Sequence, residues 1–199
     1  MDSFLNVLWL TAAGYMLGSL PFGVWMGFVF LKRDIRAGGS GHTGGTNTIR
    51  QAGWRVGALV VALDLAKSFT AGWLAQHYGM NQWAVILAGG AVVAGHCWPV
   101  FAGFKGGMGL AAAGGFILAV YPLGFALGLG LVAAGSLVLR HSARGNITAG
   151  LLLGPVLWLF SQSLTLGLLG AAMGLTVAVR SLSDWNRVYK ELWLDREKH

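Results

Sequence analysis

Residues 4–31 read FLNVLWLTAAGYMLGSLPFGVWMGFVFL, an apolar run without a charged side chain. An α-helix needs about 20 consecutive apolar residues to cross the hydrocarbon core of a bilayer, which is roughly 30 Å thick. The run therefore predicts a membrane-spanning helix. Pro21 predicts a break or kink within it, because proline removes a helical hydrogen bond.

Further apolar stretches follow, and the hydropathy pattern predicts about seven spans. The whole chain is 55% hydrophobic and 11% charged, whereas average soluble domains carry about 25% charged residues. No linker or charge block divides residues 1–199, so we expect one all-α, polytopic membrane domain. The expected spans are residues 4–31, 56–76, 82–99, 108–121, 122–139, 147–161 and 163–179. The last twenty residues resemble a short amphipathic helix at the membrane interface.

The basic residues predict the orientation of these spans. Each of the 14 Lys and Arg residues except Lys67 lies in the segments after the first, third, fifth and seventh spans. By the positive-inside rule, the amino terminus is outside and the carboxyl terminus is cytoplasmic. The net charge of +7 thus indicates topology and contact with anionic lipids, and no nucleic acid is expected as a partner.

A polar, glycine-rich loop separates the first two spans, where residues 38–50 read GGSGHTGGTNTIR. Glycines let the backbone approach an anion and turn its N–H groups inward. Ser40, Thr46 and Asn47 add neutral polar groups, and Arg50 adds a planar fork that suits phosphate oxygens. No dinucleotide or P-loop motif is present, because βαβ context is lacking and Gly45 stands where the P-loop lysine should be. The loop is predicted to bind an anion; the alternative is a flexible polar loop.

A second glycine-rich stretch follows the third span, where residues 95–109 read GHCWPVFAGFKGGMG. Lys105 and the glycines after it, at a membrane edge, again suit a phosphate group. The alternative is an ordinary loop with a snorkelling lysine. A single histidine such as His96 is more often packed and hydrogen-bonded than catalytic.

Asp64 and Lys67 are ionisable groups inside the second predicted span. Such groups are costly in a bilayer and usually face a partner or a cavity. Their i,i+3 spacing places them on one face of the helix, where they can neutralise each other. We therefore expect a structural ion pair rather than a catalytic one.

Taken together, these stretches resemble the PlsY family, the acyl-phosphate:glycerol-3-phosphate acyltransferases of the bacterial inner membrane. The resemblance extends to about residue 112 and then weakens. It is carried by residues 14–23, the loop over residues 40–50, Asp64 with Lys67, and residues 95–107.

The resemblance implies transfer of a fatty acyl group from acyl phosphate to the 1-hydroxyl of glycerol 3-phosphate, giving lysophosphatidic acid and phosphate. The active site would face the cytoplasm, among membrane lipids, without cofactor or metal. Ser40 and Arg50 match the serine and arginine of the family's first motif, and the stretch from Lys105 matches its glycerol-phosphate loop. The expected catalytic residues are Ser40, Arg50 and His96, and the expected phosphate-binding residues are Thr46, Asn47, Lys105, Gly106, Gly107 and Gly109.

An acyl phosphate already carries a good leaving group, so orientation and charge stabilisation can supply most of the rate. We hypothesise direct attack by the substrate hydroxyl, with the substrate phosphate or His96 receiving the proton. The His-x-x-x-x-Asp pair of another common glycerolipid acyltransferase type is absent, since Asn47, Phe101 and Asn146 stand five residues after the candidate histidines.

The chain departs from the family pattern at several positions. His42 replaces an asparagine and Gly45 an alanine in the first motif, and Met108 replaces a second lysine in the glycine-rich loop. After the last span, Ser181 and Asp184 stand where the family has a histidine and an asparagine. A non-catalytic binder or transporter of a phosphate-bearing lipid or metabolite is therefore the alternative function, and a small structural membrane protein is a third. The oligomeric state stays open.

Overall fold

Helices make up nearly all of the part of the chain that the computed structural model describes, residues 2–187, and this part contains no strand. The long elements are α1 (Ser3–Gly18), α2 (Phe22–Leu31), α3 (Gly45–Ala52), α4 (Trp54–Tyr78), α5 (Gln82–Cys97), α6 (Leu110–Val120), α7 (Pro122–Leu139), α8 (Ser142–Ser161) and α9 (Leu164–Ser181). Single 3-10 turns are η1 (Ile35–Ala37), η2 (Val100–Ala102) and η3 (Leu182–Asp184). The predicted all-α fold is confirmed. The expected C-terminal amphipathic helix falls, beyond Arg187, outside the described residues.

Six helical segments of the described chain are long and apolar enough to cross a membrane. They correspond to six of the predicted spans. The predicted span over residues 108–121 is helical only in α6, from Leu110 to Val120. At 1.5 Å per residue, α6 is about 16 Å long and does not reach across the hydrocarbon core by itself. The glycine-rich stretch before it stays non-helical, which is why the span is shorter than its hydropathy suggests.

The first predicted span is broken as Pro21 requires. Helix α1 ends at Gly18, and α2 begins at Phe22. Pro21 cannot donate a backbone hydrogen bond, and the break leaves carbonyl groups in the apolar interior that need other partners. One of these carbonyl groups belongs to Leu20, and it accepts a hydrogen bond from Lys67 of α4 at 2.8 Å.

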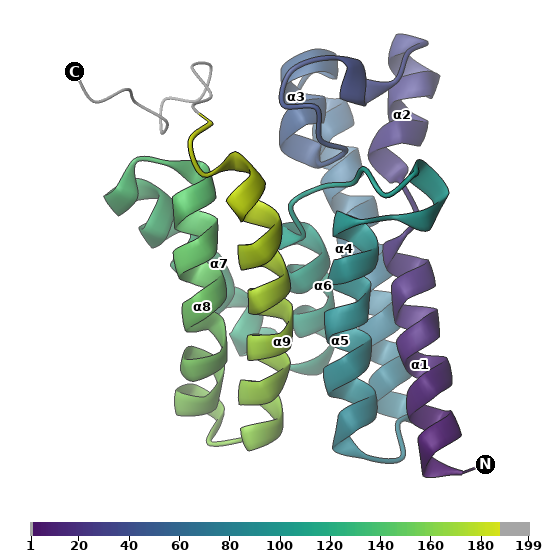
Figure 1. Ribbon diagram of the computed structural model, residues 1–199, viewed down its shortest axis with the longest axis vertical. Coiled ribbons are helices and arrows are strands. Elements are labelled where there is room, and N and C mark those ends of the chain that lie inside the picture. Colours follow the sequence, from purple (N-terminus) through teal and green to yellow (C-terminus); the bar gives the residue numbers. More distant parts are fainter. Residues whose placement is uncertain (1, 188–199) are drawn as a thin grey trace.

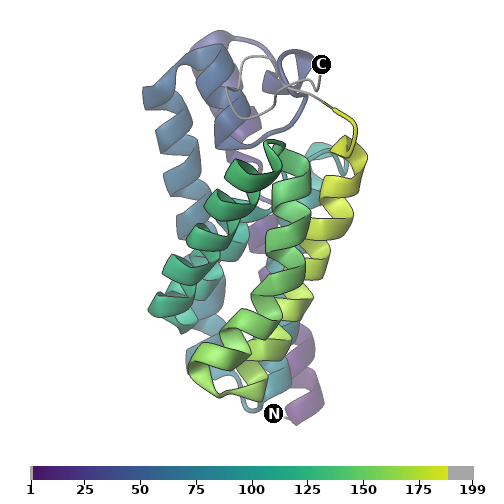
Figure 2. The same ribbon diagram turned by 90° about the vertical axis from the view of Figure 1, so that its left-hand side faces the viewer.

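The helices pack in two neighbouring groups (Figure 1). Helix α1 packs on α5, and α4 packs on α6. Helix α9 packs mainly on α8 and also on α5, while α7 packs on α8. The turned view shows the same bundle from the side of α7 and α8, with the N-terminus and the end of α9 at opposite ends (Figure 2). This agrees with an odd number of crossings when the short α6 is counted with the six long segments.

Close packing between helices depends on glycine. A Cβ atom placed on Gly18 of α1 would lie 2.1 Å from the carbonyl oxygen of Val92 in α5. Gly150 of α8 and Gly174 of α9 face each other in the same way. A Cβ atom placed on Gly150 would lie 2.4 Å from the Gly174 carbonyl oxygen, and one placed on Gly174 would lie 2.0 Å from the Gly150 carbonyl oxygen. Because lipid chains are as apolar as leucine, helices in membranes associate through such close backbone contacts rather than through hydrophobic burial.

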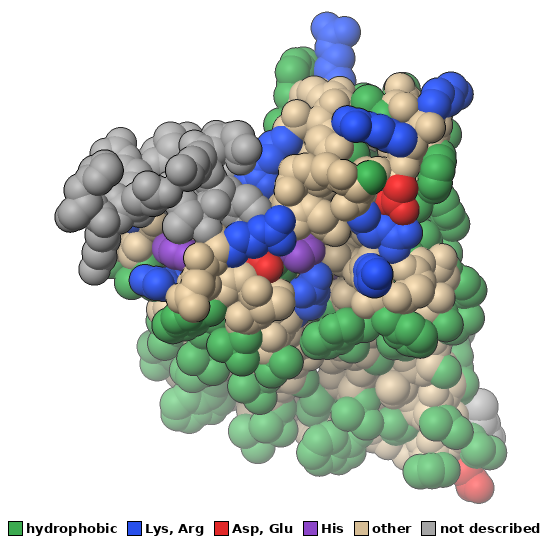
Figure 3. All heavy atoms as spheres, turned by 45° about the horizontal axis from the view of Figure 1, so that its top comes forward, with side chains coloured by type: hydrophobic (Ala, Val, Ile, Leu, Met, Phe, Trp, Pro, Cys, Tyr) green, Lys and Arg blue, Asp and Glu red, His purple; other side chains and the backbone are tan. Residues whose placement is uncertain are grey.

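Charged side chains gather at one end of the bundle. Figure 3 shows Lys and Arg side chains at the end that carries α2, α3 and the loops, with hydrophobic side chains around the body below. Large exposed hydrophobic residues such as Leu129, Val138 and Leu159 lie on these outer faces, as expected for a surface in contact with lipid. The predicted one-sided distribution of charge is therefore present in the fold.

We predict that Gly18→Ala destabilises the bundle by roughly 1–3 kcal/mol, because the added methyl group overpacks the α1–α5 contact. Thermal unfolding in detergent measures the effect. Gly130→Ala in α7 is the matched control, since a Cβ there meets nothing within 4 Å. Equal unfolding temperatures for the two variants would contradict the close-packing explanation.

Candidate active site

A buried polar network joins α4 and α5 to the break between α1 and α2 in the interior of the bundle. Lys67 Nζ lies 2.7 Å from Asp64 Oδ1, and both side chains are 2% exposed. The same ammonium group donates to the Leu20 carbonyl at the α1–α2 break and lies 3.1 Å from Nδ1 of His96. The predicted structural pairing of Asp64 with Lys67 is thus present, and it also anchors the break and His96.

The contacts of His96 within this network indicate its tautomer. Its Nδ1 is 3.1 Å from Lys67 Nζ and 3.5 Å from Asp64 Oδ1. The shorter contact, with Lys67, assigns the tautomer. Because an ammonium group offers only donors, His96 Nδ1 accepts a hydrogen bond from it and Nε2 carries the ring proton. Nε2 lies beside the second glycine-rich stretch, where a Cβ on Gly107 would come within 2.2 Å of it. His96 therefore presents a hydrogen-bond donor, which argues against the hypothesis that it receives the substrate proton.

The first glycine-rich loop is shaped from within by Asn47. The Asn47 Oδ1 atom accepts from the Ser40 N–H at 2.8 Å. Its Nδ2 atom donates to the carbonyls of Ile35 at 3.0 Å and His42 at 2.8 Å. These contacts hold the Ser40 region against the start of α3. Asn47 is expected to bind phosphate, but both of its side-chain polar atoms form hydrogen bonds within this region of the chain.

Arg36 fastens the two glycine-rich loops to each other. Its NH1 group donates to the Ala102 carbonyl at 2.6 Å and to the Lys105 carbonyl at 3.3 Å. Asp34 holds the guanidinium from the other side at 2.7 Å, and the hydrogen bond from Arg36 keeps the pKa of the Asp34 carboxyl below its usual value. The two loops are therefore held next to each other at the same end of the bundle.

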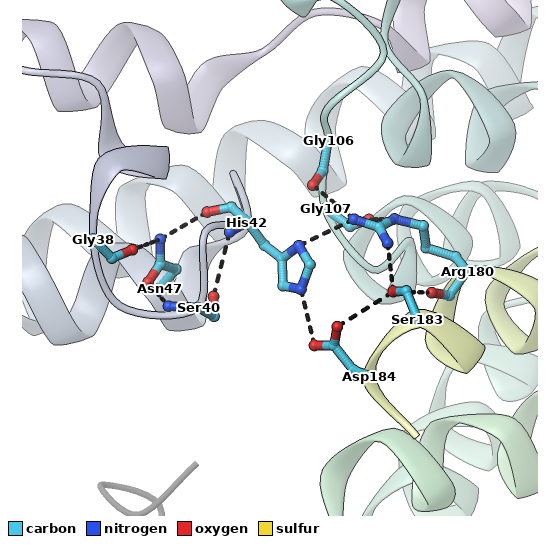
Figure 4. Close-up of polar contacts among 9 residues, drawn as sticks. All are labelled: Gly38, Ser40, His42, Asn47, Gly106, Gly107, Arg180, Ser183 and Asp184. Atoms are coloured by element: carbon cyan, nitrogen blue, oxygen red, sulfur yellow. Dashed lines mark hydrogen bonds and ion pairs between the residues drawn. The ribbon is translucent and has the colours of Figure 1, made fainter. Parts of the chain in front are cut away.

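A second cross-link joins the first loop to the end of α9 and to η3 (Figure 4). His42 Nε2 lies 2.9 Å from Asp184 Oδ2, and His42 Nδ1 lies 3.0 Å from an NH2 nitrogen of Arg180. Arg180 Nε also donates to the Gly107 carbonyl at 3.1 Å. Residues from the two loops and from the end of α9 thus converge on one place.

These segments surround a cavity of about 640 Å³. Its polar lining comes mostly from loops and helix ends near the basic end of the bundle. Its apolar lining comes from the bodies of α4, α6, α7, α8 and α9. The polar lining residues include Ser40, His42, Thr46, Asn47, Arg50, Asp64, His96, Ser136, Ser142, Asn146 and Asp184, and the apolar ones include Val61, Leu65, Ile117, Phe125, Leu129, Val132, Leu153 and Val177.

Two helices begin at the wall of this cavity. Gly44 and Gly45 line it at the start of α3, and Gly109 with Leu110 lines it at the start of α6. Gly109 has a φ of +87°, a conformation that favours glycine. Helix N-termini present free N–H groups and partial positive charge, so this end of the cavity suits an anion.

Most of the predicted site residues meet in the cavity. Its lining includes Ser40, Arg50, His96, Thr46, Asn47 and Gly109. Lys105 is exposed at the surface, and Gly106 and Gly107 are buried behind the wall rather than in the lining. Gly107 instead packs on the His96 ring.

Sequence reasoning did not assign His42, Asn146 or Asp184 to the site. His42 and Asp184 were noticed only as departures from a family pattern. Asn146 is 6% exposed and lines the cavity, yet it lies in a segment where the resemblance had weakened. Within residues 2–187, His, Cys, Asp and Glu side chains form no group that could hold a metal ion.

Comparisons with known proteins identify the family of this chain. A protein-family model described as glycerol-3-phosphate acyltransferase matches residues 8–191. A glycerol-3-phosphate acyltransferase of Listeria monocytogenes serovar 1/2a is 39% identical over 125 residues, which cover 61% of this chain and 62% of that protein. The protein of the same name from Synechococcus sp. strain CC9902 is 43% identical over 123 residues, with the same coverage. The chain thus spans less than two thirds of the length of these curated relatives.

Solved structures extend the similarity to most of the chain. Two crystal structures of PlsY, an integral membrane glycerol 3-phosphate acyltransferase, match with a TM-score of 0.77 and cover 91% of this chain and 90% of theirs. The lysophosphatidic acid form is 30% identical, and the glycerol 3-phosphate form is 32% identical.

We predict that Lys67→Met destabilises the protein by about 3–5 kcal/mol, because it leaves the Asp64 carboxylate buried without its partner. The double variant Asp64→Asn/Lys67→Met should recover part of this loss, since no uncompensated charge remains. Thermal unfolding in detergent measures both, with Thr70→Ala on the exposed face of α4 as control. A single variant as stable as the wild type would contradict a structural role for the pair.

Proposed function

Because the chain belongs to the glycerol-3-phosphate acyltransferase family, we propose that it transfers a fatty acyl group from acyl phosphate to the 1-hydroxyl of glycerol 3-phosphate. The products are lysophosphatidic acid and phosphate. The observation that carries this proposal is one continuous cavity with a cationic, donor-rich end and an apolar body. Such a cavity suits a reaction that joins a hydrocarbon chain to a phosphate-bearing polar group.

The acyl chain is proposed to lie in the apolar part of the cavity. Residues from α6, α7 and α8, such as Ile117, Phe125 and Leu153, provide this wall. Burial of the chain among them is favourable by about 25 cal/mol for each Å² of apolar surface removed from water. The carbonyl end would then stand near the polar lining, beside Ser40, His96 and Asn146.

The phosphate groups of the two substrates are proposed to bind at the polar end. Arg50 offers a planar pair of donors, and the starts of α3 and α6 offer backbone N–H groups. Lys105 is exposed at the surface, and its ammonium group is proposed to supply a further positive charge to a phosphate. Ser40 and Thr46 add neutral donors, and the lack of a side chain at Gly107 lets the second stretch approach the His96 ring.

The reaction needs no covalent intermediate on the protein. The 1-hydroxyl oxygen attacks the acyl carbonyl carbon, the bond from that carbon to the phosphate oxygen breaks, and the departing phosphate takes the hydroxyl proton. Negative charge develops on the carbonyl oxygen, where Ser40 Oγ and His96 Nε2 can donate hydrogen bonds. Removing one such donor in other enzymes typically costs about 10²–10³ in rate.

The basic end of the bundle is proposed to face the cytoplasm of a bacterial cell, as the positive-inside rule requires. Acyl phosphate and glycerol 3-phosphate would then reach the cavity from that side, and the acyl product would remain among membrane lipids.

Purified protein given glycerol 3-phosphate should form lysophosphatidic acid with acyl phosphate and not with acyl-CoA or acyl carrier protein. The measurement is conversion of labelled glycerol 3-phosphate with each donor separately. Formation of lysophosphatidic acid from acyl-CoA would contradict the proposal that acyl phosphate is the acyl donor. Binding of glycerol 3-phosphate without product from any donor would support the non-catalytic binder instead.

Arg50→Lys should lower kcat/KM by about tenfold or more, although the charge is kept, because a point charge cannot replace a bidentate guanidinium contact. Steady-state kinetics with both substrates varied measure the effect. Arg55→Lys, at the exposed start of α4, is the matched control. Wild-type kinetics in the Arg50 variant would remove this residue from the proposed site.

A further inference from the structure

His42 makes a different contact with each of its ring nitrogens. Nδ1 faces Arg180, which lies 138 residues away in the sequence, and Nε2 faces Asp184, which lies 142 residues away. Asp184 is 2% exposed, and both His42 and Asp184 line the cavity. The imidazole thus lies between a cation and a carboxylate at the polar end of the proposed site (Figure 4).

The chemistry of the two neighbours fixes the tautomer of the ring. A guanidinium group has donors and no acceptor, so Nδ1 must accept from Arg180. A carboxylate accepts, so Nε2 carries the proton and donates to Asp184. His42 in this form has no free nitrogen with which to take a proton from a substrate. Its geometry suits holding a neighbour in place.

The neighbour that His42 holds is Arg180. The guanidinium also donates to the Gly107 carbonyl at 3.1 Å and to Ser183 Oγ at 2.8 Å. It therefore lies against the glycine-rich stretch that follows Lys105. Its Nη2 atom also lies 3.5 Å from the Gly106 carbonyl. The guanidinium therefore fixes the backbone of this stretch in advance, so that less conformational freedom is lost when a phosphate binds there.

We propose that His42 is a positioning residue: it holds Arg180 against the backbone of Gly106 and Gly107, and thereby keeps the second glycine-rich stretch in place for the phosphate of glycerol 3-phosphate. Asp184 acts through His42, by keeping the proton on Nε2 so that Nδ1 stays an acceptor. This role rests on the function proposed above and adds to it a contact between the first loop and the end of α9. The contact to Arg180 is the one that matters for substrate affinity.

Two substitutions separate the contacts of His42. In His42→Asn the amide oxygen takes the place of Nδ1, so the hydrogen bond from Arg180 is kept and the contact with Asp184 is lost. In His42→Gln the amide takes the place of Nε2, so the contact with Asp184 is kept and the one with Arg180 is lost. We expect KM for glycerol 3-phosphate to stay within about twofold of wild type in His42→Asn and to rise about tenfold in His42→Gln. A tenfold change in affinity is about what the loss of one hydrogen bond to a charged group produces. The kcat should change little in either variant.

Asp184→Asn tests whether Asp184 acts through His42. In the wild-type background it should raise KM several-fold, roughly the cost of a weakened hydrogen bond. In the His42→Asn background it should add nothing, because the ring it orients is gone. His77→Gln, an exposed histidine on α4, is the control and should leave KM unchanged. Equal KM values for His42→Asn and His42→Gln, or full additivity with Asp184→Asn, would overturn the proposal.

Direct binding of glycerol 3-phosphate, measured by calorimetry without an acyl donor, separates this proposal from the proposed reaction. If the wild type forms no lysophosphatidic acid but binding weakens in His42→Gln and not in His42→Asn, the positioning role stands and the acyl transfer fails. If the wild type is active and both variants bind equally well, acyl transfer stands and the positioning role is wrong.

Discussion

The buried contact between Lys67 and Asp64 is the interaction on which the rest of the structure depends. A break in a membrane helix leaves carbonyl groups without helical partners, and in this bundle Lys67 donates a hydrogen bond to the carbonyl of Leu20. The charge that makes this possible is neutralised by Asp64 at 2.7 Å. The break then allows α2 and the first glycine-rich loop to lie over the end of the bundle. The same ammonium group turns His96 so that its Nε2 faces the second loop.

The glycine residues serve two purposes in this fold. Within the helices they allow α1 to pack on α5 and α8 on α9 at backbone contact, which stabilises a bundle that cannot rely on the hydrophobic effect between helices. In the stretch before α6 they keep the chain non-helical, so that α6 begins deep enough to line the cavity.

Two of the residues that depart from the family pattern, His42 and Asp184, meet each other in space. His42 lies in the first loop and Asp184 follows the last helix, yet their side chains form an ion pair or hydrogen bond at 2.9 Å. Arg180 completes the group and connects it to the backbone of Gly107. Changes that looked independent along the chain are thus coupled in the structure, and this coupling gives the polar end a cross-link between its first and last segments.

The sequence alone determined the all-α membrane fold, the break at Pro21, the one-sided charge and the two glycine-rich loops. These properties depend on local quantities: hydropathy over about 20 residues, the missing N–H of proline, and the position of each charge relative to the apolar runs. Only the tertiary structure decided that α6 is short, that Asn47 shapes its own loop, that His96 is a donor, and that His42 stands between Arg180 and Asp184. These depend on which atoms of distant segments come within hydrogen-bonding distance, and contacts between residues 138 or 142 positions apart leave no periodic or compositional signal in a single chain.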